Sequence, residues 1–240
     1  MELALNKLKR LEFEARIFVS FGIVINICAL SFFAFSDSQA TLIRIGNALG
    51  VFEDASLTPG YLCVAAVMSL VSVLRMWAGS VLTPVRVMAF KVQSDALKTS
   101  GPYRIVRNPI YLADFIAMCA FAVCLPPIGL LMPALLFIHY QRLILFEEES
   151  LRKRFEASFN EYLTDTPRLI PTFRSLPHLC QAKQEFRITM AGFRHNALFI
   201  LFVPGFVVAA CTHQFVHAVV IGLPAVIDWA IIHTKLGLRT

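Results

Sequence analysis

The polar residues best suited to chemistry lie in two short segments, each at one end of a long apolar run. The first reads GPYRIVRNPIY (101–111) and precedes an apolar run, whereas the second reads EEE (147–149) and follows another. Guanidinium groups bind anions, and carboxylates accept hydrogen bonds and offset positive charge. Snorkelling to an interface commonly explains basic residues at helix ends, but it does not explain three consecutive glutamates. The acidic segment is therefore the stronger indication of a functional site.

The composition indicates that these segments belong to an integral membrane protein. Hydrophobic residues make up 57% of the 240 residues, and the mean hydropathy is +0.66, above that of an ordinary soluble domain. A helix of about 20 residues crosses a hydrocarbon core roughly 30 Å thick. We therefore predict an all-α polytopic transmembrane bundle of about six spans. The apolar runs occur at 17–35, 60–82, 110–124, 128–146, 197–211 and 215–233, of which the third and fifth are short.

Basic residues alternate between the loops as six spans require. They gather before the first run, between the second and third, between the fourth and fifth, and after the sixth, while the other loops hold only Arg44. Because cytoplasmic loops carry the excess of Lys and Arg, both termini are predicted to be cytoplasmic. Topology and anionic lipid then explain the net charge of +6, and nucleic acid is not expected as a partner. Glu2, Glu12 and Glu14 precede the first run, unlike a cleaved signal peptide, so this run is expected to remain as a helix.

Pro126-Pro127 predicts a tight hairpin between the third and fourth runs, because neither proline fits inside a continuous helix. The chain then crosses the membrane after Tyr111, turns at the prolines and returns at Glu147. This path brings the two polar segments to one interfacial depth. The side chains expected to converge there are Arg107, Asn108, Asp114, Arg142, Glu147 and Glu148.

The segment after the fourth run has an amphipathic pattern. Residues 147–163 read EEESLRKRFEASFNEYL and set aromatic or apolar residues at helical spacing against basic ones. The pattern predicts an interfacial helix that leaves the end of the fourth span and lies along the cytoplasmic surface. An equally good interpretation is a helix that packs its aromatic stripe against the protein's own loops.

The two segments together carry a resemblance to a known family. GPYRIVRNPIYL, a hydrophobic hairpin, EEESLRKRF, Phe159, Tyr162 and PRLIP (167–171) follow one another. This series resembles the isoprenylcysteine carboxyl methyltransferases and the related membrane phospholipid methyltransferases. Their typical pattern is G-x-Y-x-x-x-R-H-P-x-Y, a hairpin, then E-E-x-x-L-x-x-x-F-G-x-x-Y-x-x-Y and a closing proline. The resemblance covers residues 95–171 and implies S-adenosyl-L-methionine as cofactor, bound at the cytoplasmic ends of the helices.

The resemblance also implies roles for individual residues. Glu147 is the principal cofactor ligand, because a carboxylate serves the sulfonium, the amino group and the ribose hydroxyls of this cofactor. Apart from the resemblance, the chemistry of the acceptor makes Arg107 and Arg142 candidates for seating an anionic acceptor, and Glu148 the candidate base for an amine acceptor. Without the family, both tyrosines of the first segment are typical membrane-interface residues. The implied cofactor contacts are Leu97, Tyr103, Asn108, Pro109, Ile110, Tyr111 and Glu147.

Three departures from the family pattern qualify these roles. Asn108 stands where the family has histidine, and it cannot shuttle a proton near neutrality. Glu156 replaces a glycine and Phe159 replaces the first tyrosine. Leu143 occupies the position of a substrate-binding arginine, with Arg142 beside it. Because one residue turns a helix by about 100°, Arg142 need not face the site, which weakens the case for a carboxylate acceptor.

The sequence as a whole predicts an S-adenosylmethionine-dependent membrane methyltransferase with a lipophilic acceptor. Carboxyl O-methylation of an isoprenylcysteine-like or other hydrophobic acid is the first hypothesis, N-methylation of an aminophospholipid is the alternative, and a non-catalytic membrane protein that retains the fold is a third. The active site is expected to face the cytoplasm, from the plasma or inner membrane of a bacterium or the endoplasmic reticulum of a eukaryote. Residues 1–90 are expected to hold the first membrane helices, 91–171 the methyltransferase core, and 172–240 a connector and two further spans.

The remaining signals are weaker. The six cysteines form no CxxC pair, so neither a disulfide nor a cysteine metal site is expected. His213 and His217 have a metal-chelating spacing but no third ligand, so a solvated helix end is expected and no metal is predicted. Arg75 and Asp228 lie in apolar runs, where they are expected to pair or to line the acceptor's path. For Asp228, snorkelling at an interface is an equal alternative.

Overall fold

The computed structural model describes residues 11–35, 37–50, 57–82, 97–175 and 177–237, and the regular structure of these residues is helical, with no strand among them. Each of the six predicted apolar runs contains a helix. Four helices are long and apolar enough to cross a membrane, whereas α6 and α10, with 14 and 11 residues, are shorter. The six helices are α2 (Arg16–Phe33), α4 (Leu57–Val81), α6 (Pro109–Ala122), α7 (Leu131–Asp165), α10 (Phe202–Thr212) and α11 (Phe215–Gly237).

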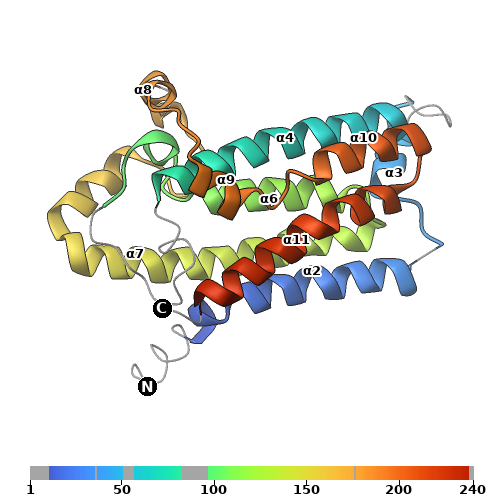
Figure 1. The fold of residues 1–240 in the computed structure, drawn as a ribbon, viewed down its shortest axis with the longest axis horizontal. Helices are drawn as coiled ribbons and strands as arrows, with labels where there is room; N and C mark the ends of the chain where they lie inside the picture. The colour runs from blue at the N-terminus through green and yellow to red at the C-terminus, as the bar shows by residue number, and fades with distance from the viewer. Residues whose placement is uncertain (1–10, 36, 51–56, 83–96, 176, 238–240) are drawn as a thin grey trace.

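Short helices and 3-10 turns connect these six helices. They are α3 (Thr41–Ala48), α8 (His178–Gln184) and α9 (Met190–Asn196), with 3-10 turns η2 (Gly101–Arg104), η3 (Pro127–Leu130) and η4 (Phe173–Ser175). Figure 1 shows that α2, α6 and α10 run in one direction while α4, α7 and α11 return. Consequently the start of α2, the end of α11 and the turn η2 all lie at the same end of the bundle. This alternation confirms the polytopic helical fold.

The predicted hairpin lies at the opposite end of the bundle from η2. The chain leaves α6, turns at Pro126 and enters α7 through η3. The first turn of α3 closes over this hairpin. The backbone N–H and the hydroxyl of Thr41 both donate to the carbonyl of Leu125, at 2.8 and 2.9 Å, and the N–H of Leu42 donates to that of Val123 at 2.7 Å. These bonds satisfy carbonyl groups that the end of α6 leaves without helical partners.

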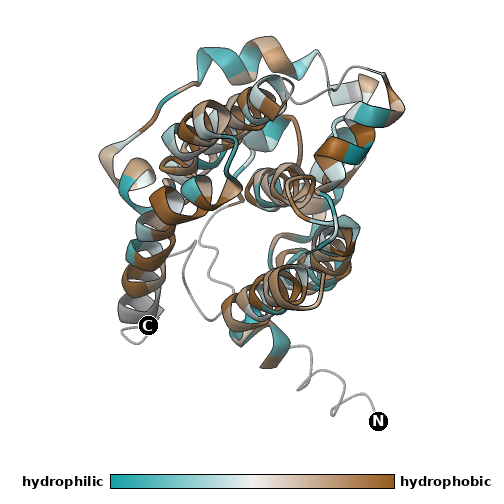
Figure 2. Ribbon diagram, turned by 90° about the vertical axis from the view of Figure 1, so that its right-hand side faces the viewer, coloured by the Kyte–Doolittle hydropathy of each residue, from teal (hydrophilic) through white to brown (hydrophobic). Residues whose placement is uncertain are grey.

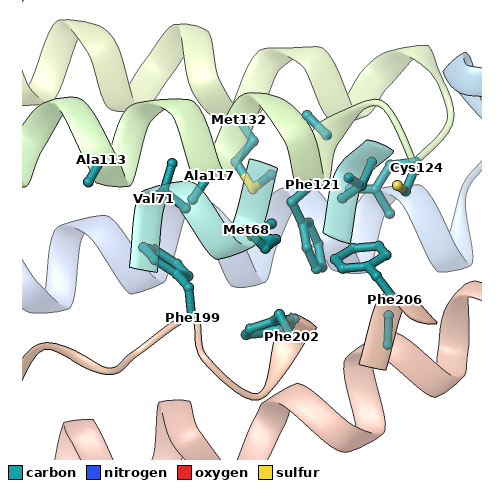
Figure 3. Close-up of a cluster of buried hydrophobic side chains, with 14 of the residues drawn as sticks. Met68, Val71, Ala113, Ala117, Phe121, Cys124, Met132, Phe199, Phe202 and Phe206 are labelled. Atoms are coloured by element: carbon teal, nitrogen blue, oxygen red, sulfur yellow. The ribbon is translucent and has the colours of Figure 1, made fainter. Parts of the chain in front are cut away.

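The core lies where α4 packs between α6 and α10. Ala113 and Ala117 on α6 are fully buried and let the backbones of α4 and α6 approach closely. Figure 3 shows these alanines facing Met68 and Val71, with aromatic rings from the α9–α10 region closing the cluster. Phe121 is the centre of the aromatic contacts, with ring centroids 5.9 Å from Phe202, 6.5 Å from Phe206 and 5.1 Å from Phe215.

The outer faces of the long helices are as apolar as the core. Figure 2, which looks along the bundle, shows hydrophobic residues around most of each helix. Because exposure of apolar surface is unfavourable in water and favourable in lipid, this distribution is typical of membrane proteins. The exposed hydrophobic side chains include Phe18, Ile25, Leu70, Ile138, Val220 and Ile227.

The helix predicted to begin at Glu147 and to lie along the membrane surface does not begin there. Helix α7 continues without interruption past Glu147 and bends only at Glu156, whose φ of 32° and ψ of −100° are not helical. Beyond the bend, Phe159 is buried and the Tyr162 hydroxyl donates to the carbonyl of Tyr103 at 2.6 Å. The aromatic stripe therefore packs against the protein's own loops, which was the alternative interpretation, while Arg152 and its basic neighbours are exposed.

Several residues that supported the orientation fall outside the described part of the chain. They are Lys7, Lys9, Arg10, Arg86, Lys91 and Arg239. The division at residue 90 also falls there, and the three predicted regions stay a prediction.

Candidate active site

A single cavity of ≈ 370 Å³ brings the predicted residues together at the η2 end of the bundle. Its size is within the range of small-molecule sites, about 300–1,000 Å³. The cavity reaches from the polar segment before α6 into the apolar interior at Met68, Phe121 and Leu136. The predicted site residues that line it are Leu97, Tyr103, Arg107, Asn108, Pro109, Ile110, Tyr111, Glu147 and Glu148.

A charged clamp holds the polar end of the cavity. Glu148, with 12% of its side chain exposed, lies between two guanidinium groups: Nε of Arg107 donates at 2.9 Å, and Nη2 of Arg168 donates at 2.9 Å. Arg107 also donates to the carbonyl oxygens of Thr166 and Leu163. We call these three charged residues the Arg107–Glu148–Arg168 clamp. It ties the GPYRIVRNPIY segment to α7 and to the chain that follows α7.

Asn108 has a positioning role in this arrangement. Its amide nitrogen donates to the carbonyl of Arg168 at 3.0 Å, and the preceding backbone N–H of Arg107 donates to that of Pro167 at 2.9 Å. Pro109 follows as the first residue of α6, a position that suits its fixed φ and missing N–H. The RNP sequence thus begins α6 and fixes its start against the PRLIP segment.

Tyr111 and Glu147 meet across the cavity at the first turn of α6. The Tyr111 hydroxyl donates to Oε1 of Glu147 at 2.9 Å, and the Tyr111 ring lies 5.2 Å from that of Tyr140. This contact realises the predicted convergence of the two segments. It presents a carboxylate and two aromatic rings to the same space.

The 3-10 turn η2 forms the outer wall of the cavity. Tyr103 is 7% exposed, and burial raises the pKa of its phenol well above the ordinary value, so it stays protonated. Gly101 has a φ of +58°, and a Cβ there would lie 3.1 Å from the Trp77 ring. A glycine therefore suits this turn both in conformation and in space.

A second ion pair fixes η2 from outside. Glu185, just after α8, accepts from Arg104 at 2.8 Å and from the backbone N–H of Gly101. The hydrogen bond from Arg104, then that from Gly101, lowers the pKa of Glu185, and the hydrogen bond to Glu185 raises the pKa of Arg104. The segment expected to be only a connector thus contacts the GPY turn directly.

Arg142 is not part of the cavity. Its side chain is 57% exposed, and Nη2 donates to Glu12 at 2.7 Å, whereas the neighbouring Leu143 is 2% exposed and lines the cavity. The 100° turn between adjacent helical residues explains this. The structure therefore does not bring Arg142 to the other predicted site residues, and its predicted seating of the acceptor has no geometric support.

The cavity contains charged residues that motif reasoning did not assign. Arg75 on α4 pairs with Asp114 on α6, and both side chains line the cavity. Arg75 does not pair with Asp228, which is exposed. In the sequence, Arg168 could be recognised only as part of the PRLIP segment. For Arg75 and Asp114 the sequence signal was a charged residue inside an apolar run.

The two histidines at the other end of the bundle have local partners. Nε2 of His213 lies 3.0 Å from the Thr58 hydroxyl, and Nδ1 of His217 lies 2.7 Å from that of Thr212. Within the described residues, no group of three or more His, Cys, Asp or Glu side chains has an arrangement suited to a metal. The contacts agree with the helix-end interpretation of these histidines.

The fold and the cavity together define a multi-pass membrane protein with an internal polar site. Residues 56–158 match the family model described as phospholipid methyltransferase, the family that the sequence resembles. The match confirms the family resemblance and extends it to α4. Neither the curated proteins nor the solved structures contain a match to the chain. The family indicates methyl transfer as the class of reaction.

Proposed function

We propose that this protein is an S-adenosylmethionine-dependent methyltransferase that modifies a lipophilic acceptor. The observation that carries the proposal is the cavity, which joins the Tyr111–Glu147 contact to an interior lined by Met68, Phe121 and Leu136. A polar cofactor suits the first part, and a hydrocarbon chain suits the second. The family description supports the same reaction class.

The residues at the polar end fit this cofactor chemically. Glu147 offers carboxylate oxygens to the cofactor's amino group or ribose hydroxyls, and Tyr103 and Tyr111 offer aromatic faces to its cationic or adenine parts. Leu97, Pro109 and Ile110 add apolar contacts at the same wall. When bound, S-adenosylmethionine supplies a methyl group activated on a sulfonium.

The protein's own contribution is positioning and exclusion of water. The Arg107–Glu148–Arg168 clamp and Asn108 fix the segment that carries the cofactor contacts. Two reactants held in contact geometry gain effective molarities of about 10⁵ M or more. Glu148 stays the predicted base for an amine acceptor, and to act as one it has to release a guanidinium partner.

Two acceptors remain as candidates. A carboxylate is already a nucleophile, so O-methylation of a hydrophobic acid requires only a cation to seat it. With Arg142 outside the cavity, the cations that line it are Arg16, Arg75, Lys98 and Arg107. N-methylation of an aminophospholipid is favoured by the family description. The excess of Lys and Arg in alternate loops supports a cytoplasmic site, in the plasma or inner membrane of a bacterium or the endoplasmic reticulum of a eukaryote.

The test is transfer of a radiolabelled methyl group from S-adenosylmethionine by the purified protein in lipid–detergent micelles. Farnesylcysteine analogues and phosphatidylethanolamine are compared as acceptors. Label that mild alkali releases indicates a methyl ester, and alkali-stable label indicates an N-methyl group. Transfer to neither acceptor class, together with no cofactor binding, would favour a non-catalytic protein that retains the fold.

A further inference from the structure

An ion pair lies in the cavity one helical turn farther from the clamp than Tyr111 and Glu147. Arg75 is 3% exposed, and its Nη1 donates to Oδ1 of Asp114. Asp114 follows Tyr111 by three residues on α6, so the two side chains share a face and are about 4.5 Å apart along the helix. Both charged side chains line the cavity.

The pair leaves part of the arginine without a partner. Its Nε is buried and has no hydrogen-bond acceptor among the described residues. The guanidinium carbon lies 5.8 Å from the ring centroids of Phe199 and Trp229, so its other neighbours are aromatic faces. A buried N–H without an acceptor is destabilising, and replacing a buried ion pair by apolar residues is often neutral or stabilising. Stability alone therefore does not account for a guanidinium at this point of a membrane-type bundle.

The order of residues along the cavity places this pair between the two proposed ligands. On α6 the lining residues are Tyr111, Asp114, Met118 and Phe121, which form one helical stripe that changes from polar to apolar. On α7 the corresponding stripe runs from Glu147 through Tyr140 to Leu136. An amphiphile with its chain at the apolar end thus has its head group beside Arg75.

We propose that Arg75 binds an anionic oxygen group, a carboxylate or a phosphate, in the head group of an amphiphilic acceptor. Asp114 is a positioning residue that holds the guanidinium against the cavity wall. The inference rests on the proposed function, because it names the chemical class of that acceptor. It assigns the anion-seating role to α4. Arg142 lies outside the cavity, and of the cations that line it (Arg16, Arg75, Lys98 and Arg107) Arg75 is the one paired with Asp114, one turn beyond Tyr111 on the α6 stripe.

Tryptophan fluorescence tests this without cofactor or catalysis. The chain has two tryptophans, and Trp77→Phe leaves Trp229, which lies beside Arg75 and lines the cavity. The probe is 2-bromododecanoate, which carries its quenching bromine next to the carboxylate. Its methyl ester is the uncharged match. Dodecanoate, dodecyl phosphate and dodecyltrimethylammonium are competitors that separate carboxylate, phosphate and cation.

The Trp77→Phe protein should bind the acid about tenfold or more tightly than the ester, the value of one good hydrogen bond to a charged group. Arg75→Gln alone would leave Asp114 buried without its cation, so the test variant combines Arg75→Gln with Asp114→Asn. This double variant should bind acid and ester equally. Arg44→Gln, the same change at an exposed site on α3, should keep the preference.

Four outcomes overturn the inference. Three come from the quenching titrations: equal binding of acid and ester by the Trp77→Phe protein, a preference that survives in the double variant, and displacement by dodecyltrimethylammonium as effective as that by both anions. The fourth comes from competition with the cofactor. If S-adenosylmethionine displaces the probe and the double variant loses cofactor affinity, Arg75 serves the cofactor's carboxylate and the assignment to the acceptor is wrong. Failure of the proposed function is separate, since absence of methyl transfer leaves the quenching result unchanged.

Discussion

Glu148→Gln tests the clamp that fixes the polar end of the cavity. The side chains of Glu148 and Arg107 are 12% and 10% exposed, whereas that of Arg168 is 38% exposed. Breaking a buried ion pair costs about 3–5 kcal/mol, and a pair with an exposed partner contributes about 0–1 kcal/mol. Because Arg107 keeps the carbonyl acceptors of Thr166 and Leu163, we expect Glu148→Gln to lower the free energy of unfolding by about 2–3 kcal/mol. For Arg168→Gln we expect about 0–1 kcal/mol.

Equilibrium denaturation by dodecyl sulfate in mixed micelles measures these differences. The cycle of Arg107→Gln, Glu148→Gln and the double variant should give a coupling energy above about 1 kcal/mol. Glu149→Gln is the matched control, because this neighbouring glutamate is 42% exposed and pairs with a surface lysine, and it should stay within about 0.5 kcal/mol of the parent. If Glu148→Gln costs no more than Arg168→Gln, or if the coupling is absent, the reasoning about the clamp is refuted.

Three further predictions concern sites around the cavity. Glu156→Gly should raise the free energy of unfolding by about 1 kcal/mol, because the strained φ costs more than the added flexibility of glycine, and Glu156→Ala should give no such gain in the same denaturation assay. Arg142→Gln should leave the KM for an acidic acceptor within about twofold, which is a negligible binding energy, and a tenfold rise would return this residue to the site. Since the pKa of Glu185 is lowered in the folded protein, its bond to η2 contributes stability above the ordinary value of 4.5 and loses it as pH falls below that value. The protection factors of the α8 amides, which are corrected for the intrinsic pH dependence of exchange, should therefore fall below pH 4.5. Glu185→Gln should give the lower protection already at pH 7, an outcome that a merely exposed glutamate would not produce.

Much of the fold could be predicted because hydropathy and proline positions carry it. The apolar runs located all six helices of the bundle, and Pro126-Pro127 located the hairpin, since both signals act through short-range constraints. The sequence predicted that the chain leaves the fourth span at Glu147, nine residues before α7 bends. The sequence change at Glu147 marks a change of environment, whereas the bend occurs at Glu156, where the family pattern has a glycine and the backbone adopts a positive φ.

The site could be predicted only where a motif or a helix end defined it. The hairpin alone predicted that the GPYRIVRNPIY segment and Glu147 reach the same end of the bundle, whereas the specific contact between Tyr111 and Glu147 came from the structure. The Arg75–Asp114 pair joins residues that are 39 positions apart on different helices, and no local pattern records which intramembrane acid faces which base. The orientation of Arg142 depended on a single 100° step of helix, which sequence spacing could leave open but not decide.

The central claim is that the cavity binds S-adenosylmethionine through Glu147. Isothermal titration calorimetry of the detergent-purified protein measures this directly. We predict micromolar binding by the parent protein, at least about tenfold weaker binding by Glu147→Gln, and unchanged binding by Glu149→Gln. Absence of binding by the parent, or equal affinity of the parent and Glu147→Gln, would contradict the claim.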